Sequence, residues 1–197
     1  MKNQVNKPLT DTTFEAAVII CLEHDPVNGL CNLEPYGMMP DWDVSQVTDM
    51  SYAFYRYSSF NGNISNWDLS SVTNMTSMFG GALAFKQDII NWDVSQVTNM
   101  FSMFGKASAF NGNINSWDVS NVTNMSYMFS GASSFNQNIG SWDVSSVTHM
   151  SSMFYNAPSF NQDLSKWDTS DVTNKEYMFR RTPAWKLPKP NFKTLNK

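Results

Sequence analysis

Histidine and cysteine are scarce in this chain of 197 residues, which contains two of each. His24 and His149 lie far apart in sequence, and no glycine-rich phosphate loop, nucleophile elbow or zinc-binding helix motif accompanies them. The sequence therefore predicts that the protein is not an enzyme and has no cofactor. The spacing of Cys21 and Cys31 fits no zinc or redox motif. The two cysteines are candidates for a disulfide, with free thiols as the alternative.

Charge is also scarce, because Asp, Glu, Lys and Arg make up only 15% of the residues. Residues 1–170 hold 6 basic and 15 acidic residues, a net charge of −9, which argues against nucleic acid as a partner. Residues 171–197 hold 7 basic and 2 acidic residues, a net charge of +5. This basic end is either a contact for an anionic surface or a solvated tail.

Long apolar runs are absent, since none approaches the 18 residues that a transmembrane helix needs. We therefore expect no membrane span in this chain. Residues 16–22 are apolar, but they lack a basic start and a small-residue cleavage site. We accordingly expect neither a signal peptide nor an anchor in this stretch of sequence.

Tryptophan, in contrast, recurs every 25 residues with no insertion. The six members of this column are Trp42, Trp67, Trp92, Trp117, Trp142 and Trp167. A valine column from Val47 to Val172 and a phenylalanine column from Phe54 to Phe179 keep the same register. Self-similarity at a fixed period of this length is the sequence signature of a stacked repeat protein.

The second half of each unit has the periodicity of a helix. In one unit Met75, Met78, Phe79 and Ala82 fall at positions i, i+3, i+4 and i+7. Thr73 precedes them and suits the N-cap position. We therefore predict a short helix in every repeat.

The first half of each unit predicts a short strand. Ile64, Trp67, Leu69 and Val72 have the L-x-x-L-x-L spacing of leucine-rich repeats. Units of this size are unstable alone but can stack with their strands in parallel. The predicted fold class is α/β, a leucine-rich-repeat-like right-handed solenoid of six 25-residue strand–helix repeats with terminal caps.

We expect four segments along the chain. Residues 1–9 are disordered or tag-like, 10–40 form an N-terminal helical cap, 41–185 form the six-repeat solenoid, and 186–197 form a basic tail. The cap prediction rests on a helical stripe of apolar residues: Phe14, Ala17, Val18 and Cys21.

The repeat W-D-V-S-x-V-T-N-M-S-x-M-F-x-x-A-x-x-F-N-x-x-I resembles that of the BspA-like leucine-rich repeat surface proteins, including the mycoplasma lipoprotein-type repeat. The similarity covers roughly residues 41–185. It implies a secreted or cell-surface protein that adheres to host proteins or to other cells. The expected partner is therefore a protein or a cell-surface ligand, and the oligomeric state is left open.

Aspartate follows tryptophan in every unit, which predicts a ladder of carboxylates. Its members are Asp43, Asp68, Asp93, Asp118, Asp143 and Asp168. Carboxylates ~4.8 Å apart repel one another by about 1 kcal/mol per neighbouring pair even in water. Either each carboxylate accepts hydrogen bonds from its own turn, as in an Asx-turn, or Ca²⁺ or a cationic partner neutralises the ladder.

Aromatic and basic residues interrupt the repeat where other units carry small or polar side chains. The candidates for partner binding are Tyr52, Tyr55, Arg56, Tyr57, Phe101, Tyr127 and Tyr155, and Lys106 and His149 are similar exceptions. Exposed Tyr and Arg are favoured at interaction hot spots, although ordinary surface variation is the alternative. The sequence thus predicts a non-enzymatic adhesion or protein-recognition module. A structural spacer or glycan-binding segment of a larger secreted protein is the second hypothesis.

Overall fold

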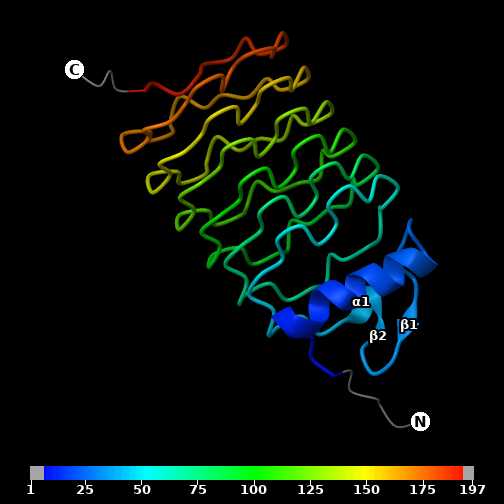
Figure 1. Cartoon of the computed structure of the whole chain (residues 1–197). Helices are drawn as coiled ribbons and strands as arrows, with labels where there is room; N and C mark the ends of the chain where they lie inside the picture. The colour runs from blue at the N-terminus through cyan, green and yellow to red at the C-terminus, as the bar shows by residue number, and fades with distance from the viewer. Residues whose placement is uncertain (1–6, 193–197) are drawn as a thin grey trace.

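The computed structural model describes residues 7–192, and they form a stack of coils with one helix, α1, packed at its N-terminal end (Figure 1). Most of the predicted disordered segment 1–9 and the last part of the tail 186–197 lie outside the described residues. Residues 7–9 differ from the prediction because they are ordered. Leu9 is fully buried, and its N–H donates to the Asp43 carbonyl at 2.8 Å.

The N-terminal segment contains all the regular secondary structure among the described residues. It comprises α1 (Asp11–His24), β1 (Asn32–Leu33), β2 (Gly37–Met38) and the 3-10 helix η1 (Met39–Asp41). The two strands pair in antiparallel orientation. The helix buries the apolar stripe that the sequence indicated, Phe14, Ala17, Val18 and Cys21, and also Leu22.

Contacts from α1 close the N-terminal end of the stack. The Phe14 ring packs edge-on against the Trp67 indole, with 5.7 Å between centroids. The Asp11 carboxylate accepts the Thr48 N–H and the Thr48 hydroxyl, both at 2.7 Å. A disulfide joins Cys21 to Cys31 with 5.2 Å between their Cα atoms, so α1 is tied covalently to the chain that leads into β1.

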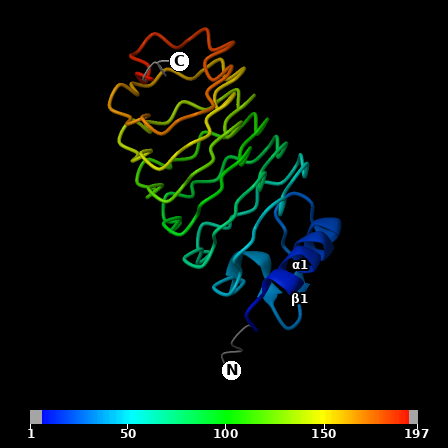
Figure 2. The same ribbon diagram turned by 60° about the vertical axis from the view of Figure 1, so that its left-hand side comes forward.

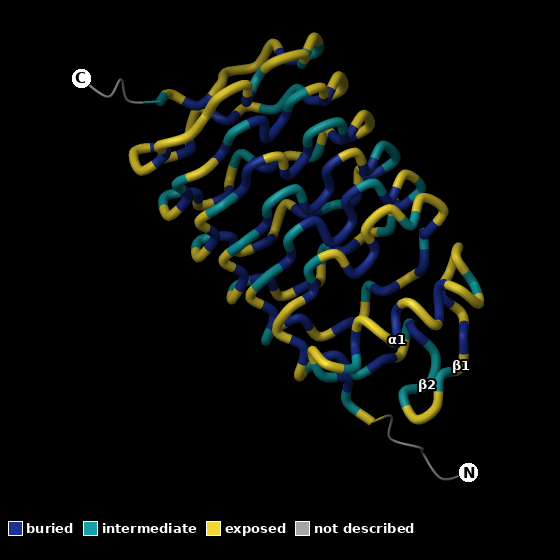
Figure 3. The backbone as a smooth tube through the Cα atoms, in the orientation of Figure 1, coloured by how far each residue is buried: buried dark blue, intermediate teal, exposed yellow. Residues whose placement is uncertain are grey.

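From Trp42 onward each 25-residue unit makes one turn of the stack, which we call a coil and number from its tryptophan. Single-residue parallel bridges join equivalent positions of successive coils: Asp49, Asn74, Asn99, Asn124, His149 and Asn174. Figure 2 shows the coils lying over one another along the whole stack. Buried residues follow the interior of each coil, and exposed residues lie at its turns (Figure 3).

The predicted helix is not present in any described repeat. Residues 75–82 form successive turns in which N–H groups alternate between two kinds of acceptor. Ser77 and Phe79 donate to carbonyls of the next coil, both at 2.8 Å, whereas Met78 and Gly80 donate three residues back within their own coil. An α-helix would use all of these donors internally. The strand prediction is likewise reduced to single-residue bridges, so the repeat is not a strand–helix unit.

Identical side chains stack in the core as ladders. The rings of Phe79 and Phe104 are 5.5 Å apart and nearly parallel, and Trp117 and Trp142 are 6.5 Å apart. Each indole from Trp92 to Trp167 also donates a hydrogen bond to the preceding coil, as when Trp117 Nε1 donates to the Ile89 carbonyl at 3.1 Å. The ladders therefore satisfy the polar atom of tryptophan while burying its apolar surface.

The C-terminal end of the stack is covered by the last part of the sixth coil, from Trp185 onward. Trp185 lies edge-on against Phe154, Phe160 and Phe179, with centroid distances of 5.4, 4.8 and 5.2 Å. The Pro188 carbonyl accepts the Leu164 N–H at 2.9 Å, and Pro190 is buried. The described part of the basic tail thus packs against the repeats, which differs from the solvated-tail alternative.

Candidate functional site

One surface of the stack has the same backbone in every coil but different side chains. We call it the turn face and define it as residues 51–57 with the equivalent residues 76–82, 101–107, 126–132, 151–157 and 176–182. At the Tyr52 position φ lies between 51° and 60° in all six coils, and at the Arg56 position it lies between 56° and 75°. Positive φ suits the third residue of a tight turn. The regular backbone thus leaves the side chains free to vary.

Charge on the turn face is opposite to that of the body. The six segments hold four basic residues and one acidic residue, Glu176 in the last coil. The Arg56 guanidinium lies over the Tyr55 ring at 5.2 Å, and the Arg181 guanidinium lies over the Tyr155 ring at 5.7 Å. Aromatic rings therefore hold these cations on the surface.

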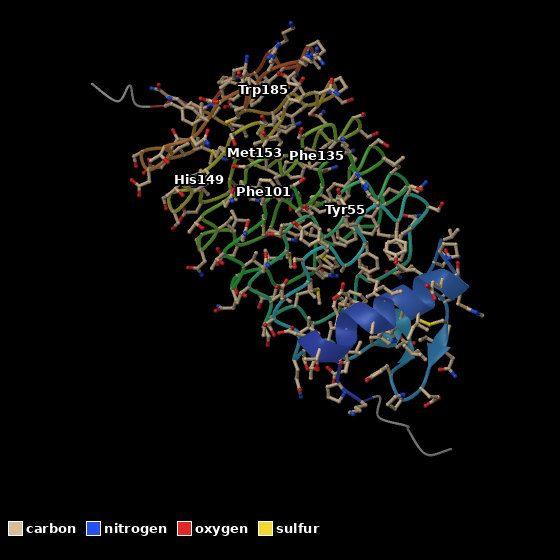
Figure 4. The ribbon with its side chains drawn as sticks, viewed as in Figure 1. Tyr55, Phe101, Phe135, His149, Met153 and Trp185 are labelled. Carbon is tan, nitrogen blue, oxygen red and sulfur yellow. A yellow bond between two sulfur atoms is a disulfide. The ribbon has the colours of Figure 1, made fainter. Side chains whose placement is uncertain are left out.

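The first four coils enclose a groove of about 230 Å³ on the turn face. Tyr55 of the first coil and Tyr127 of the fourth are among its lining residues, and Arg56 and Lys106 line it as well. Three glycines complete much of the lining: Gly80, Gly81 and Gly105. Figure 4 shows Tyr55 and His149 toward opposite edges of the stack.

The candidate partner residues are not equally available in the structure. Tyr52, Tyr55 and Tyr127 are 55%, 40% and 42% exposed, so each offers much of its ring to a partner. Tyr57, in contrast, is partly buried and packs against the core.

Two further candidates are half-buried: Phe101 packs on Tyr127 at 5.6 Å, and Tyr155 lies beneath Arg181. The structure thus brings Tyr55, Arg56, Lys106 and Tyr127 together at one groove.

The glycines are the part of this site that sequence reasoning missed. Gly80 and Gly105 stand where the first and fifth coils carry Tyr55 and Tyr155. The ring of Tyr55 lies over Gly80, where an added Cβ would come within 2.9 Å of it. The sequence signal that could have indicated the groove was glycine in place of tyrosine in two consecutive units, at Gly80 and Gly105.

The aspartate ladder lies outside the turn face, and its carboxylates bind their own turns. The Asp118 carboxylate accepts the Ser120 hydroxyl at 2.7 Å and the Ser120 N–H at 3.0 Å. The hydroxyl bond first, and then the N–H bond, lower the pKa of Asp118, while partial burial and the neighbouring Asp93 charge raise it. The Asx-turn alternative describes this geometry. Among residues 7–192 no group of three or more potential ligands could hold a metal ion.

His149 lies in the column of bridge residues and not in the groove. It stands where other coils have asparagine or aspartate, and its Nδ1 is 2.8 Å from the Thr148 hydroxyl.

Within the described chain, no helix is both long and apolar enough to cross a bilayer.

These features define a class, a stacked-repeat protein with a regular core and a variable turn face. Residues 32–126 and again 112–196 match a family described as Mycoplasma protein of unknown function, DUF285. The two matches together span most of the chain, and the protein belongs to this family. No curated protein and no solved structure matches the chain.

Proposed function

We propose that this protein is a non-enzymatic surface protein that recognises a partner protein through its turn face. In this proposal the chain is a BspA-like, leucine-rich-repeat-like right-handed solenoid, secreted or displayed at the cell surface and used for adhesion. The stack serves as a rigid scaffold, and the exceptions to the repeat supply specificity.

The groove lined by Tyr55, Arg56, Lys106 and Tyr127 is the observation that supports this proposal best. Exposed tyrosine and arginine offer large contact areas and are enriched at binding hot spots. The repeated polar residues elsewhere are already engaged by their own turns or by the next coil, as Asp118 is by Ser120. They leave little unsatisfied chemistry for a partner.

The alternative is a structural spacer or glycan-binding segment of a larger secreted protein. A spacer needs only the stacked core, and the 25-residue period without insertions favours a regular rod. A glycan-binding segment would use exposed rings as platforms, but the tryptophans of the repeat are 3–4% exposed and lie in the core.

Binding of the purified chain to an array of extracellular proteins, run beside a glycan array, tests the proposal. We expect saturable binding to a protein, and a variant with Tyr55→Ser and Tyr127→Ser weakens it by about tenfold or more, as loss of hot-spot residues does. A matched variant outside the turn face, Ser95→Ala with Ser145→Ala, serves as the control. Equal binding by all three proteins, or binding to glycans alone, contradicts the proposal.

A further inference from the structure

We infer that the groove over the first four coils binds an extended acidic segment of a partner protein, with acidic side chains about three residues apart. This inference rests on the proposed function of the turn face and adds the chemical class of the ligand.

The shape of the groove depends on glycines that stand where other coils carry large side chains. Gly80 and Gly105 leave the turn face open in the second and third coils, whereas the first and fifth coils carry tyrosine at that position. Tyr55 and Tyr127 come from coils three steps apart, so at ~4.8 Å per coil they are separated by about 14 Å along the stack. A space of this length suits four or five residues of extended chain.

The charge of the groove favours an anionic ligand. Arg56 and Lys106 both line it, and none of its lining residues is a carboxylate. The Arg56 side chain passes over Gly81, with its Cγ 3.5 Å from where a Cβ would stand, and Lys106 passes over Gly131 in the same way at 3.3 Å. Because the rest of the repeat region is acidic, an acidic segment is repelled elsewhere and attracted here.

The backbone of the groove rules out recognition by strand addition. Gly81 and Lys106 donate their N–H groups to the next coil, at 2.7 and 2.6 Å, and Gly105 donates to Ser102 at 2.9 Å. These donors are unavailable to a bound main chain, so side chains must carry the recognition.

The spacing of the cations selects an extended peptide. Arg56 and Lys106 are two coils apart, which is ~10 Å along the stack. A polyproline II segment rises ~3.1 Å per residue with three residues per turn, so every third side chain lies on one side at intervals of ~9 Å. Acidic residues with this period can face both cations, and the exposed rings of Tyr55 and Tyr127 can pack on prolines between them.

The same lining disfavours a glycan. No Asn, Gln, Asp or Glu side chain lines the groove, although such planar groups pair well with sugar hydroxyls. The hydroxyl donors there are Ser102, Ser130 and the two tyrosines.

Calorimetric titration with two short synthetic peptides tests the inference. One peptide has glutamate at every third position with prolines between, and the other has the same composition with its glutamates adjacent. We expect the spaced peptide to bind, and to bind about fivefold or more tightly than the clustered one. Arg56→Gln and Lys106→Gln should each weaken binding of the spaced peptide by about fivefold or more, as expected for loss of a charge contact.

Two further variants distinguish binding in the groove from general charge attraction and from loss of folding. Lys86→Gln removes an exposed lysine outside the groove, and binding should stay unchanged. Ser130→Tyr fills the groove with the residue that the fifth coil already carries at that position, and it should abolish binding while the melting temperature stays the same.

Several outcomes overturn the inference. Equal binding of both peptides, or equal losses from Lys86→Gln and Lys106→Gln, reduces the effect to general charge attraction. Stronger binding of a sulfated oligosaccharide than of the spaced peptide assigns the groove to glycans. If a protein partner depends on Tyr55 and Tyr127 but the spaced peptide fails to bind, the acidic-segment inference is wrong and the proposed function stands.

Discussion

At the residue scale, the aspartate ladder combines mutual repulsion with strong local hydrogen bonds. Asp93, Asp118 and Asp143 each feel the charge of a neighbouring aspartate, and each also accepts hydrogen bonds from the serine two residues later. The hydrogen bonds outweigh the repulsion, because the pKa values of Asp68, Asp93, Asp118 and Asp143 all lie below the ordinary value. The carboxylates of the ladder are therefore held by hydrogen bonds within their own coils.

The direction of these pKa shifts predicts how stability depends on pH. A carboxyl group whose pKa is lower in the folded chain stabilises it above the unfolded pKa of ~3.9, and this contribution disappears as pH falls through the folded pKa. We expect the melting temperature to fall between about pH 5 and pH 2. Asp118→Asn should lower the melting temperature at pH 7 and converge with the original chain near pH 2, as a pH series of melting curves would record.

Asp171→Asn, an exposed aspartate outside the ladder, is the control for that series. It should follow the original chain at every pH. A higher melting temperature for Asp118→Asn at pH 7 would mean that repulsion, rather than the Ser120 bonds, dominates the ladder.

The residues of the core could be predicted from the sequence, but the hollow of the groove could not. Met75, Met78, Phe79 and Ala82 are all fully buried, as their spacing indicates. A glycine such as Gly80 has no side chain and contributes nothing to a periodicity argument. Its meaning depends on Tyr55, which is 25 residues earlier in sequence but directly adjacent in space.

At the element scale, the turn segments mimic the periodicity of a helix without its backbone. Turns that each close three residues back bring residues at i, i+3, i+4 and i+7 to the interior, which is the stripe that also predicts a helix. The sequence could predict which side chains are buried, but not that alternate N–H groups bond to the next coil. The acceptor of each of these N–H groups depends on the presence of the neighbouring coil.

Substitutions at Asn156 distinguish the turn from a helix. Asn156 has φ of 56°, and glycine occupies the equivalent position as Gly81 and Gly131. We expect Asn156→Val to lower the free energy of unfolding by about 1–2 kcal/mol, because a branched Cβ is strained at positive φ. Asn156→Gly should cost less than about 0.5 kcal/mol. In a helix, glycine would be more destabilising than valine. Urea unfolding of the two variants therefore distinguishes the turn from a helix by which variant is less stable.

The disulfide leads to a prediction about the stability of the N-terminal cap. Cys21 and Cys31 enclose a short loop, so the bond should contribute about 2–3 kcal/mol by restricting the unfolded chain. Replacing both cysteines with serine should lower the melting temperature, and adding reductant to the original chain should give a similar loss. The double variant should then be insensitive to reductant. No change on reduction would show that the bond does not stabilise the cap.

At the scale of the whole molecule, each coil contacts mainly its two neighbours, and the two ends are closed by different means. The first coil is covered by α1, and the last is closed by its own residues from Trp185 through Phe192. Stability in such a stack is approximately a sum of terms from single coils and from the interfaces between them. A whole coil should therefore be removable if the register of the remaining coils is preserved.

Deletion of residues 142–166 tests this property. Trp167 would then occupy the place of Trp142, whose indole N–H donates to the Ile114 carbonyl at 3.1 Å, and the interior ladders would continue in register. We expect a folded chain with a lower melting temperature and a smaller denaturant slope, because less surface is buried. The groove lies in earlier coils and should keep its peptide affinity. Deletion of residues 142–165 instead leaves one extra residue, which turns the interior positions outward. This variant should fail to fold. If both deletions fold equally well, the register of the ladders does not determine whether the stack forms.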